Sequence, residues 1–195
     1  ISFLAQGFGS KGHRVTIVSS DKDFLQVVDD NVEVYSPIKK KIYKKRDVAE
    51  ELGMIPENYL IVKSLLGDNS DNLTGVKGLG IKTILKEFPG IINDPNFNLE
   101  SIFSICEEKL KTKKIFARIV HEWDKVETNY ELMNLLEPRL SDQEILYILN
   151  KIEQPTTSLQ VQPFLRMLEI DKIEALNKNV EGWLEVFRPL STYQK

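Results

Sequence analysis

Leu66-Gly-Asp-Asn-Ser-Asp-Asn72 and Gly75-Val-Lys-Gly-Leu-Gly-Ile-Lys-Thr83 are the two neighbouring runs that decide how this sequence of 195 residues folds. The first run holds two carboxylates, Asp68 and Asp71, whose spacing puts them on one face of a helical turn. The second run contains three glycines, which permit a tight turn whose backbone closely approaches a ligand. We therefore expect an acidic site joined directly to a glycine hairpin.

A second acidic pair follows the run Arg14-Val-Thr-Ile-Val-Ser19, which is β-branched and has the character of a buried strand. Asp21 and Asp23 stand two residues apart, so an extended backbone puts both carboxylates on one side. The carboxyl end of such a strand is where α/β folds hold their sites. Converging carboxylates repel one another, and hard divalent ions such as Mg²⁺ relieve that repulsion. Aspartates also commonly cap helices and form turns, so each acidic pair alone could be structural, and this alternative stays open.

The glycine run fails two phosphate-binding patterns. Ile81 separates Gly80 from Lys82, whereas a Walker A loop needs glycine and lysine adjacent. Thr83 stands at the last glycine position of a dinucleotide fingerprint, and no strand precedes the run. A hairpin between two helices fits better, with Lys82 assisting contacts to DNA phosphates without base specificity. The alternative is a helix–helix turn that needs glycine for its geometry alone.

Ser19-Ser-Asp-Lys-Asp-Phe24 and the two runs quoted first, in this order, resemble motifs of the flap-endonuclease/5′→3′ exonuclease family. That family includes phage 5′ exonucleases and the 5′-nuclease domain of bacterial DNA polymerase I. The similarity covers roughly residues 1–90. It implies an α/β fold in three parts, namely the end of a PIN-like parallel-sheet nuclease domain over 1–67, a helix-hairpin-helix DNA-binding region over 68–110, and a helical C-terminal region over 111–195.

The resemblance also implies roles for particular residues. The catalytic carboxylates, which hold Mg²⁺ or Mn²⁺ as a pair of ions, would be Asp21, Asp23, Asp68 and Asp71. A K⁺ ion between hairpin and DNA would be held by the backbone carbonyls of Gly75, Val76 and Leu79. The remaining DNA contacts would come from Lys63, Gly78, Gly80, Lys82 and Thr83.

The implied function is a structure-specific 5′ nuclease that hydrolyses phosphodiester bonds by two-metal-ion catalysis. Its partners would be branched, nicked or 5′-flap DNA, RNA–DNA hybrids and other replication proteins. Residues 1–8 form an uncapped helical pattern, and the family's other acidic ligands do not occur here, so we expect the C-terminal part of a longer nuclease. The alternative is a non-catalytic DNA-binding module. On either account we expect the chain alone to bind branched DNA and to cleave it negligibly.

The bulk composition is that of an ordinary globular protein, and its formal net charge of −3 does not decide for or against DNA. The distribution of charge is more informative, because six of the eight residues over 39–46 are basic. That run is typical of a solvated hairpin edge and could also follow a DNA strand. The single cysteine cannot form an internal disulfide, which indicates a reducing cytoplasm, the host's if the protein is phage-encoded. No apolar run is long enough to span a membrane.

The remaining periodicity predicts a β-hairpin from residues 31–35 and 41–43, followed by mostly helical structure. The expected helices cover residues 46–52, 56–66, 99–109, 111–122, 141–151 and 171–177.

Overall fold

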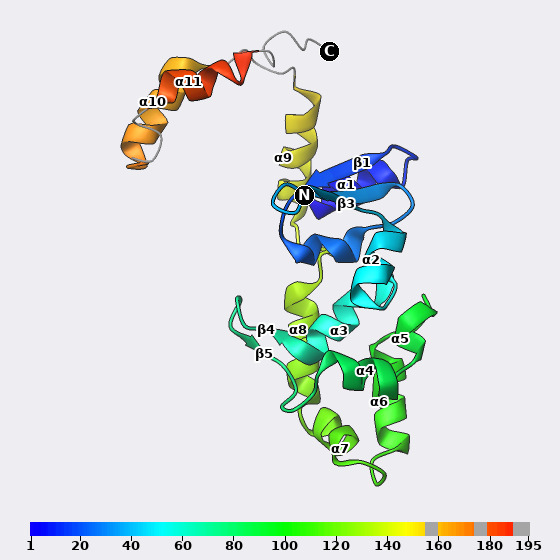
Figure 1. The fold of residues 1–195 in the computed structure, drawn as a ribbon. Coiled ribbons are helices and arrows are strands. Elements are labelled where there is room, and N and C mark those ends of the chain that lie inside the picture. The colour runs from blue at the N-terminus through cyan, green and yellow to red at the C-terminus, as the bar shows by residue number, and fades with distance from the viewer. Residues whose placement is uncertain (155–159, 174–178, 189–195) are drawn as a thin grey trace. The chain divides into compact units, whose positions relative to one another are not determined.

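The computed structural model describes residues 1–154, 160–173 and 179–188 and divides the chain into two units, residues 1–138 and 139–195. The elements of the first unit, labelled in Figure 1, are α1 (Ser2–Gly9), β1 (Val15–Val18), η1 (Lys22–Val27), β2 (Val32–Ser36), β3 (Lys41–Tyr43), α2 (Lys45–Leu52), η2 (Pro56–Asn58), α3 (Tyr59–Leu66), β4 (Gly67–Asp68), β5 (Leu73–Thr74), α4 (Ile81–Glu87), α5 (Gly90–Asn93), α6 (Leu99–Glu108), α7 (Lys114–His121) and α8 (Trp123–Met133). The second unit contains α9 (Asp142–Glu153), α10 (Val161–Ile170) and α11 (Val180–Glu185).

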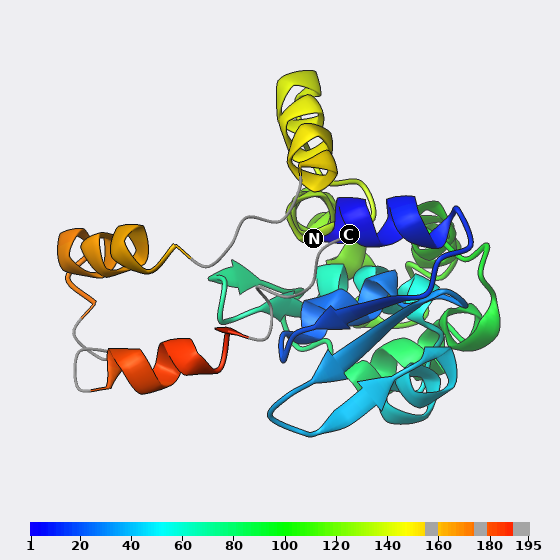
Figure 2. The same ribbon diagram turned by 90° about the horizontal axis from the view of Figure 1, so that it is seen from above.

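Three strands form a small mixed sheet with β2 in the middle (Figure 2). β1 pairs with β2 in parallel, with Val15 opposite Val32, and β2 pairs with β3 antiparallel, with Val34 opposite Tyr43. Alternate residues of β2 are buried, as expected of a strand with one face on a core. This core also includes residues from α1, η1 and α2. The parallel pair and the helices around it make the chain an α/β protein, as the sequence predicts.

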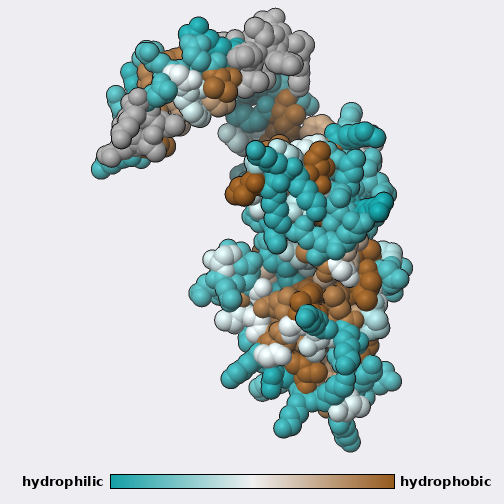
Figure 3. Space-filling view, in the orientation of Figure 1, coloured by the Kyte–Doolittle hydropathy of each residue, from teal (hydrophilic) through white to brown (hydrophobic). Residues whose placement is uncertain are grey.

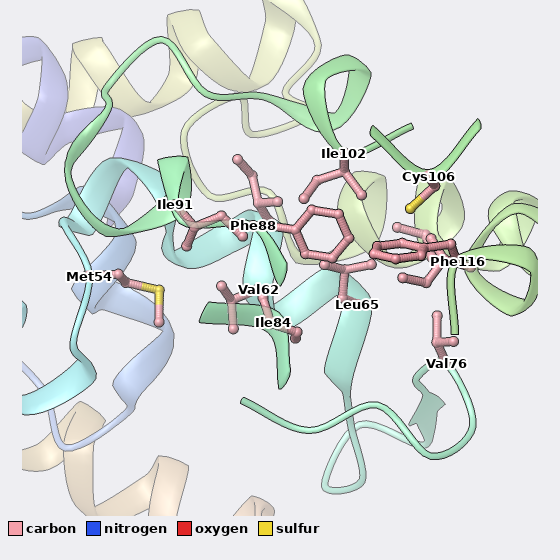
Figure 4. Close-up of a cluster of buried hydrophobic side chains, with 13 residues drawn as sticks. Met54, Val62, Leu65, Val76, Ile84, Phe88, Ile91, Ile102, Cys106 and Phe116 are labelled. Carbon is pink, nitrogen blue, oxygen red and sulfur yellow. The ribbon is translucent and has the colours of Figure 1, made fainter. Parts of the chain in front are cut away.

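A second core lies among the helices that follow α2 (Figure 4). Its largest fully buried side chains include Phe88 and Phe116, whose rings meet edge to face with centroids 6.0 Å apart. Leu65 on α3 and Val76 in the glycine run belong to the same core. The loop that carries the glycines is therefore attached to this helical core by an apolar side chain of its own.

The helix α8 was not predicted, although its residues carry a helical signal. Trp123, Val126, Tyr130 and Met133 recur at spacings of three or four and face inward. α8 packs along α3, which ties residues 123–133 to the first unit. The structure thus divides the chain after Pro138, whereas the predicted boundaries at residues 67 and 110 fall inside the first unit.

The second unit was predicted less well. The predicted helix over 141–151 is observed as α9, whose Ser141 and Glu144 form a capping box. The helices α10 and α11 were not predicted, and Phe164 of α10 stacks on Trp183 of α11 with centroids 5.3 Å apart. The predicted helix over 171–177 extends into residues 174–178, which lie outside the described residues.

Hydrophilic residues cover most of the visible surface over β1–β3, and apolar residues reach the surface around α4 and α6 (Figure 3). Among the described residues, no helix combines the length and apolar character needed to cross a membrane.

The basic residues over 39–46 are largely paired with carboxylates. Glu51 on α2 accepts hydrogen bonds from Lys39 at 2.9 Å and from Lys41 at 3.2 Å. Hydrogen bonding by Lys39, aided by Tyr43 and Lys41, lowers the pKa of Glu51 from 4.5 to about 2. The other contacts join Lys44 to Glu33, Lys45 to Glu57 and Arg46 to Glu50. The Glu51 pairs tie the β2–β3 hairpin to α2, and all of these pairs favour the solvated-edge interpretation of the basic run.

The Glu51 network generates a pH-dependent stability prediction. Because the folded pKa lies below the ordinary value, the stabilisation is present above about pH 4.5 and is lost as the pH falls toward about 2. Glu51→Gln should cost about 1 kcal/mol of unfolding free energy at pH 7 and little at pH 2.5, measured by urea denaturation. Glu50→Gln, which removes a more exposed pair with Arg46, is the control. If the loss of unfolding free energy in Glu51→Gln were as large at pH 2.5 as at pH 7, the lowered pKa of Glu51 would be contradicted.

Candidate metal centre and the neighbouring glycine loop

Asp21 and Asp23 follow β1. Asp21 lies just before η1, and Asp23 lies in its first turn. The carboxylate of Asp21 caps η1, because its Oδ1 accepts a hydrogen bond from the Asp23 backbone N–H at 2.9 Å. This short bond fixes the first turn of η1 and directs Asp23 away from the strand. The two carboxylates therefore take different local positions, even though they stand only two residues apart.

Asp68 and Asp71 lie on a β-hairpin and not on the predicted helical turn. Gly67 ends α3 with a φ of 72°, and Gly67 and Asp68 then pair antiparallel with Leu73 and Thr74. The hairpin projects from the end of α3 (Figure 1). The expectation of one helical face was thus wrong, since Gly67, with a φ of 72° and a ψ of −177° that only glycine readily adopts, ends the helix before Asp68.

The hairpin turn also fixes the Asp68 carboxylate. Its Oδ1 accepts hydrogen bonds from the backbone N–H of Ser70 at 2.9 Å and from the Ser70 hydroxyl at 2.5 Å. These bonds, together with one from Lys63, hold the pKa of Asp68 far below its usual range. Asp68 is therefore an anion at any pH near neutrality and is oriented before any ligand binds.

Three of the four predicted carboxylates converge. One oxygen each from Asp23, Asp68 and Asp71 lies within 4.8 Å of the others, although η1 and the β4–β5 hairpin are far apart in the chain. Asp21 does not belong to this group, since its side chain caps η1. Asp23 and Asp68 are half-buried, and Asp71 is exposed. We call Asp23, Asp68 and Asp71 the acidic cluster.

Lys63, which is predicted to contact DNA, pairs with two carboxylates of the acidic cluster. Its side chain, from the last turn of α3, is only 8% exposed. The ammonium donates to Asp23 Oδ1 in a close contact and to Asp68 Oδ2 at 2.9 Å. Burial alone lowers the pKa of Lys63, but the bonds to these carboxylates outweigh it and raise the pKa, so the lysine stays charged.

The donors of the acidic cluster fit a hard divalent cation. All three ligating groups are carboxylates, which Mg²⁺ and Mn²⁺ prefer over nitrogen or sulfur. Asp71 is solvent-exposed and makes no hydrogen bond or ion pair within the described part of the chain, so its oxygens are available. A cation that keeps several waters suits a cluster open on one side.

The glycine loop, which we define as residues 75–80, begins beside the acidic cluster and packs tightly on the end of α3. A Cβ on Gly75 would stand 2.0 Å from the carbonyl oxygen of Leu66, so only glycine fits there. The next residue, Val76, donates its backbone N–H to the Leu65 carbonyl at 2.9 Å. Asn129, buried on α8, donates to the carbonyls of Ser64 and Thr74 at 3.0 and 3.1 Å. The loop is thereby fixed to both α3 and α8.

The tip of the loop is held by α7 and the residue after it. Arg118 donates to the carbonyl of Lys77, and the Glu122 carboxylate accepts from the Lys77 backbone N–H. Gly78 follows with a φ of 75°, a conformation that side chains disfavour. The backbone N–H and the carbonyl of Lys77 are thus both engaged, while its side chain is exposed.

The predicted ligand-contacting residues of this loop lie at different depths. Gly78, Gly80 and Lys82 are exposed, and Thr83 is half-buried in the first turn of α4. Of the three carbonyls expected to hold K⁺, that of Val76 accepts the Leu79 N–H at 3.1 Å, and the other two belong to Gly75 and Leu79. Asn129, Arg118 and Glu122 were not predicted, because a single polar residue on a helix gives no sequence signal of the backbone it will contact.

The chain is similar to curated exonucleases and DNA polymerases. The chain is 32% identical over 182 residues to a 5′-3′ exonuclease of Aquifex aeolicus, covering 89% of this chain and 58% of that protein. It is 33% identical over 149 residues to the thermostable DNA polymerase I of Thermus thermophilus, covering 74% of this chain and 18% of that protein. No protein-family model matches the chain.

The fold also matches a solved structure of a bacteriophage T5 flap endonuclease complex with DNA and metal ions. The TM-score is 0.56 at 22% identity, covering 69% of this chain and 48% of that one. At this identity the likeness concerns the fold. The chain spans about half the length of the curated exonucleases that it matches.

The anchoring of the loop by Asn129 can be tested directly. Asn129→Ala leaves two carbonyls without their donor and should lower the unfolding free energy by about 1–3 kcal/mol. Hydrogen exchange at the Val76 amide should accelerate more than the global loss explains, since the loop loses its attachment to α8. Glu127→Ala, at an exposed position of the same helix, is the control. Equal exchange at Val76 in both variants would show that Asn129 does not hold the loop.

Proposed function

This chain belongs with the 5′→3′ exonucleases and the 5′-nuclease part of DNA polymerase I that it matches. From that relationship we propose that it is part of a metal-dependent 5′ nuclease. The chain supplies the acidic cluster and a DNA-contacting loop of a metal-dependent 5′ nuclease. The substrate is DNA with a nick, branch or 5′ flap, or the equivalent RNA–DNA hybrid. The reaction is hydrolysis of a phosphodiester bond, performed alongside other replication proteins in the cytoplasm of a bacterium or phage-infected host.

The observation that carries this proposal is the convergence of Asp23, Asp68 and Asp71. Like charges this close are unfavourable unless positive charge compensates them, and the single ammonium of Lys63 leaves the three carboxylates with a net negative charge. A divalent ion used for phosphodiester hydrolysis would balance that remaining charge. The T5 flap endonuclease with the same fold was crystallised with DNA and metal ions, which supports the same ligands here.

The residues of the acidic cluster would hold Mg²⁺ or Mn²⁺. When bound, such ions supply an activated water and stabilise the attacking and leaving oxygens of the phosphodiester. Asp23 and Asp68 come from η1 and the β4–β5 hairpin, while Ser70 keeps Asp68 oriented. Asp21 acts as a positioning residue, because its hydrogen bond fixes the turn that carries Asp23.

The glycine loop would bind the sugar–phosphate backbone of the duplex beside the acidic cluster. Exposed Gly78 and Gly80 let the strand approach the loop, and Lys82 supplies a charge with no ion pair among the described residues. Thr83 would add a hydroxyl contact. The helix-hairpin-helix geometry and a K⁺ ion on the carbonyls of the loop are part of this proposal.

A non-catalytic, shape-reading DNA-binding module is the second candidate. It is favoured by the composition of the acidic cluster, in which two of the three carboxylates pair with the Lys63 ammonium and Asp21 takes no part. Cleavage of a 5′-labelled flap oligonucleotide with Mg²⁺ separates the two candidates when the chain is assayed together with the part of a matched exonuclease that it does not cover. Divalent-dependent cutting near the 5′ end supports the nuclease, and tight binding without cutting supports the module.

The metal assignment predicts a response of stability to divalent ions. Mn²⁺ at about 100 times its dissociation constant should stabilise the chain by about 2.7 kcal/mol, seen as a raised melting temperature. Asp68→Asn with Asp71→Asn should abolish this response. The control is Asp30→Asn with Asp124→Asn, which removes two exposed carboxylates outside the acidic cluster. A wild-type melting temperature indifferent to Mn²⁺ would remove the basis for the metal site.

The DNA assignment predicts a particular salt dependence. Lys82→Ala should weaken binding to all duplex sequences alike and reduce the salt slope by about one unit, the signature of one lost phosphate contact. Gly78→Val should weaken binding further, since a β-branched side chain strains a φ of 75° and blocks the strand. Lys11→Ala, an exposed lysine after α1, is the control. Wild-type affinity in both loop variants would make the loop a purely structural turn.

A further inference from the structure

Lys63 is unusual because it is a buried lysine whose ammonium pairs with carboxylates of the acidic cluster. Leu60 to Leu65 are all buried, so this part of the helix is enclosed by other elements. The lysine side chain is 8% exposed, and its ammonium contacts the two half-buried carboxylates, Asp23 and Asp68. A buried ammonium is costly unless charged partners compensate it, and here those partners are cluster carboxylates.

The contacts of Lys63 occupy two of the carboxylate oxygens that a metal ion could use. Asp68 Oδ1 is already taken by Ser70, so Oδ2 is the oxygen left to bind a cation, and Lys63 donates to it at 2.9 Å. Asp23 Oδ1 is also bonded to the same ammonium. Asp71 alone among the three keeps both oxygens free of protein contacts within the described residues.

The net charge of the acidic cluster also sets Lys63 against a metal ion. Three carboxylates contribute −3 and the ammonium +1, which leaves −2 in the acidic cluster. One divalent ion balances that charge, and a second would leave it positive while Lys63 remains in place. An ammonium beside a divalent ion is also repelled by it.

We propose that Lys63 is a built-in competitor for the metal, whose ammonium and a divalent cation contend for Asp23 Oδ1 and Asp68 Oδ2. With Lys63 between these carboxylates, the acidic cluster takes a cation mainly through Asp71 and the oxygens that remain. Full ligation by Asp23 and Asp68 requires the ammonium to withdraw. This inference rests on the proposed function, since it deepens the account of the same metal site.

Once it leaves Asp23 and Asp68, the Lys63 ammonium is available to a DNA phosphate. A released ammonium stays tethered to α3 beside the acidic cluster, where a bound phosphate carries negative charge. Lys63 can therefore exchange a carboxylate partner for a phosphate partner, which couples loading of the metal to loading of DNA. A purely structural ion pair would show neither competition nor exchange.

The first test measures Mn²⁺ binding by isothermal titration to the 195-residue chain without DNA. Lys63→Met keeps the length of the side chain and removes its charge, so Mn²⁺ should bind at least roughly tenfold more tightly than to wild type. In EDTA the same variant should melt at a lower temperature, because the carboxylates have lost their counter-ion. Lys11→Met, which removes an exposed charge that makes no ion pair among the described residues, should change neither quantity.

A second measurement uses the wild-type protein and does not depend on how Lys63→Met folds. Acylation of lysines, followed by peptide mass spectrometry, reports the accessibility of Lys63 and Lys11 in one sample. Mn²⁺ should raise the labelling of Lys63 several-fold relative to EDTA and leave Lys11 unchanged.

The outcomes separate this inference from the proposed function. If Mn²⁺ binds wild type but Lys63→Met binds it no more tightly, or if Lys63 labelling does not respond to bound Mn²⁺, the competition is overturned and the metal site stands. If neither protein binds Mn²⁺, the metal site of the proposed function is overturned, and the competition with it.

Discussion

The contact between the Lys63 ammonium and the carboxylates of Asp23 and Asp68 is the interaction on which the rest of the site depends. It joins the end of α3 to η1 and to the β4–β5 hairpin, which belong to different parts of the chain. Lys63 could not be buried alone, nor Asp23 and Asp68 half-buried, because each charge needs the other to offset its desolvation. A positive group at this place therefore decides whether the acidic cluster exists as a cluster.

The surrounding fold keeps this contact in register. The sheet core positions η1, and the helical core positions α3, so the acidic cluster lies where two separate cores meet in the first unit. Asn129 and Gly75 hold the start of the glycine loop against α3, and Arg118 holds its tip. The acidic cluster and the proposed DNA-binding loop thus both contact α3. This shared helix fixes the distance between the candidate metal site and the residues that would bind DNA.

Much of this arrangement could be predicted from sequence, because the signals are local. The β-branched run ending at Ser19 predicts β1, and the glycine at position 53, with a φ of 73°, ends α2 as expected. The position of Asp68 and Asp71 on a hairpin was missed, since helical spacing also fits the turn that follows Gly67. The exclusion of Asp21 and the pairing of Lys63 could not be predicted, because both depend on contacts between distant segments.

The central claim is that Asp23, Asp68 and Asp71 form a divalent-cation site in which Lys63 competes. The most direct measurement is an anomalous-difference map from crystals of the chain soaked in Mn²⁺. The account predicts a peak within bonding distance of oxygens from all three carboxylates, with the Lys63 ammonium moved off Asp68 Oδ2. A map with no peak in the acidic cluster, in crystals where Mn²⁺ is otherwise visible, would contradict it.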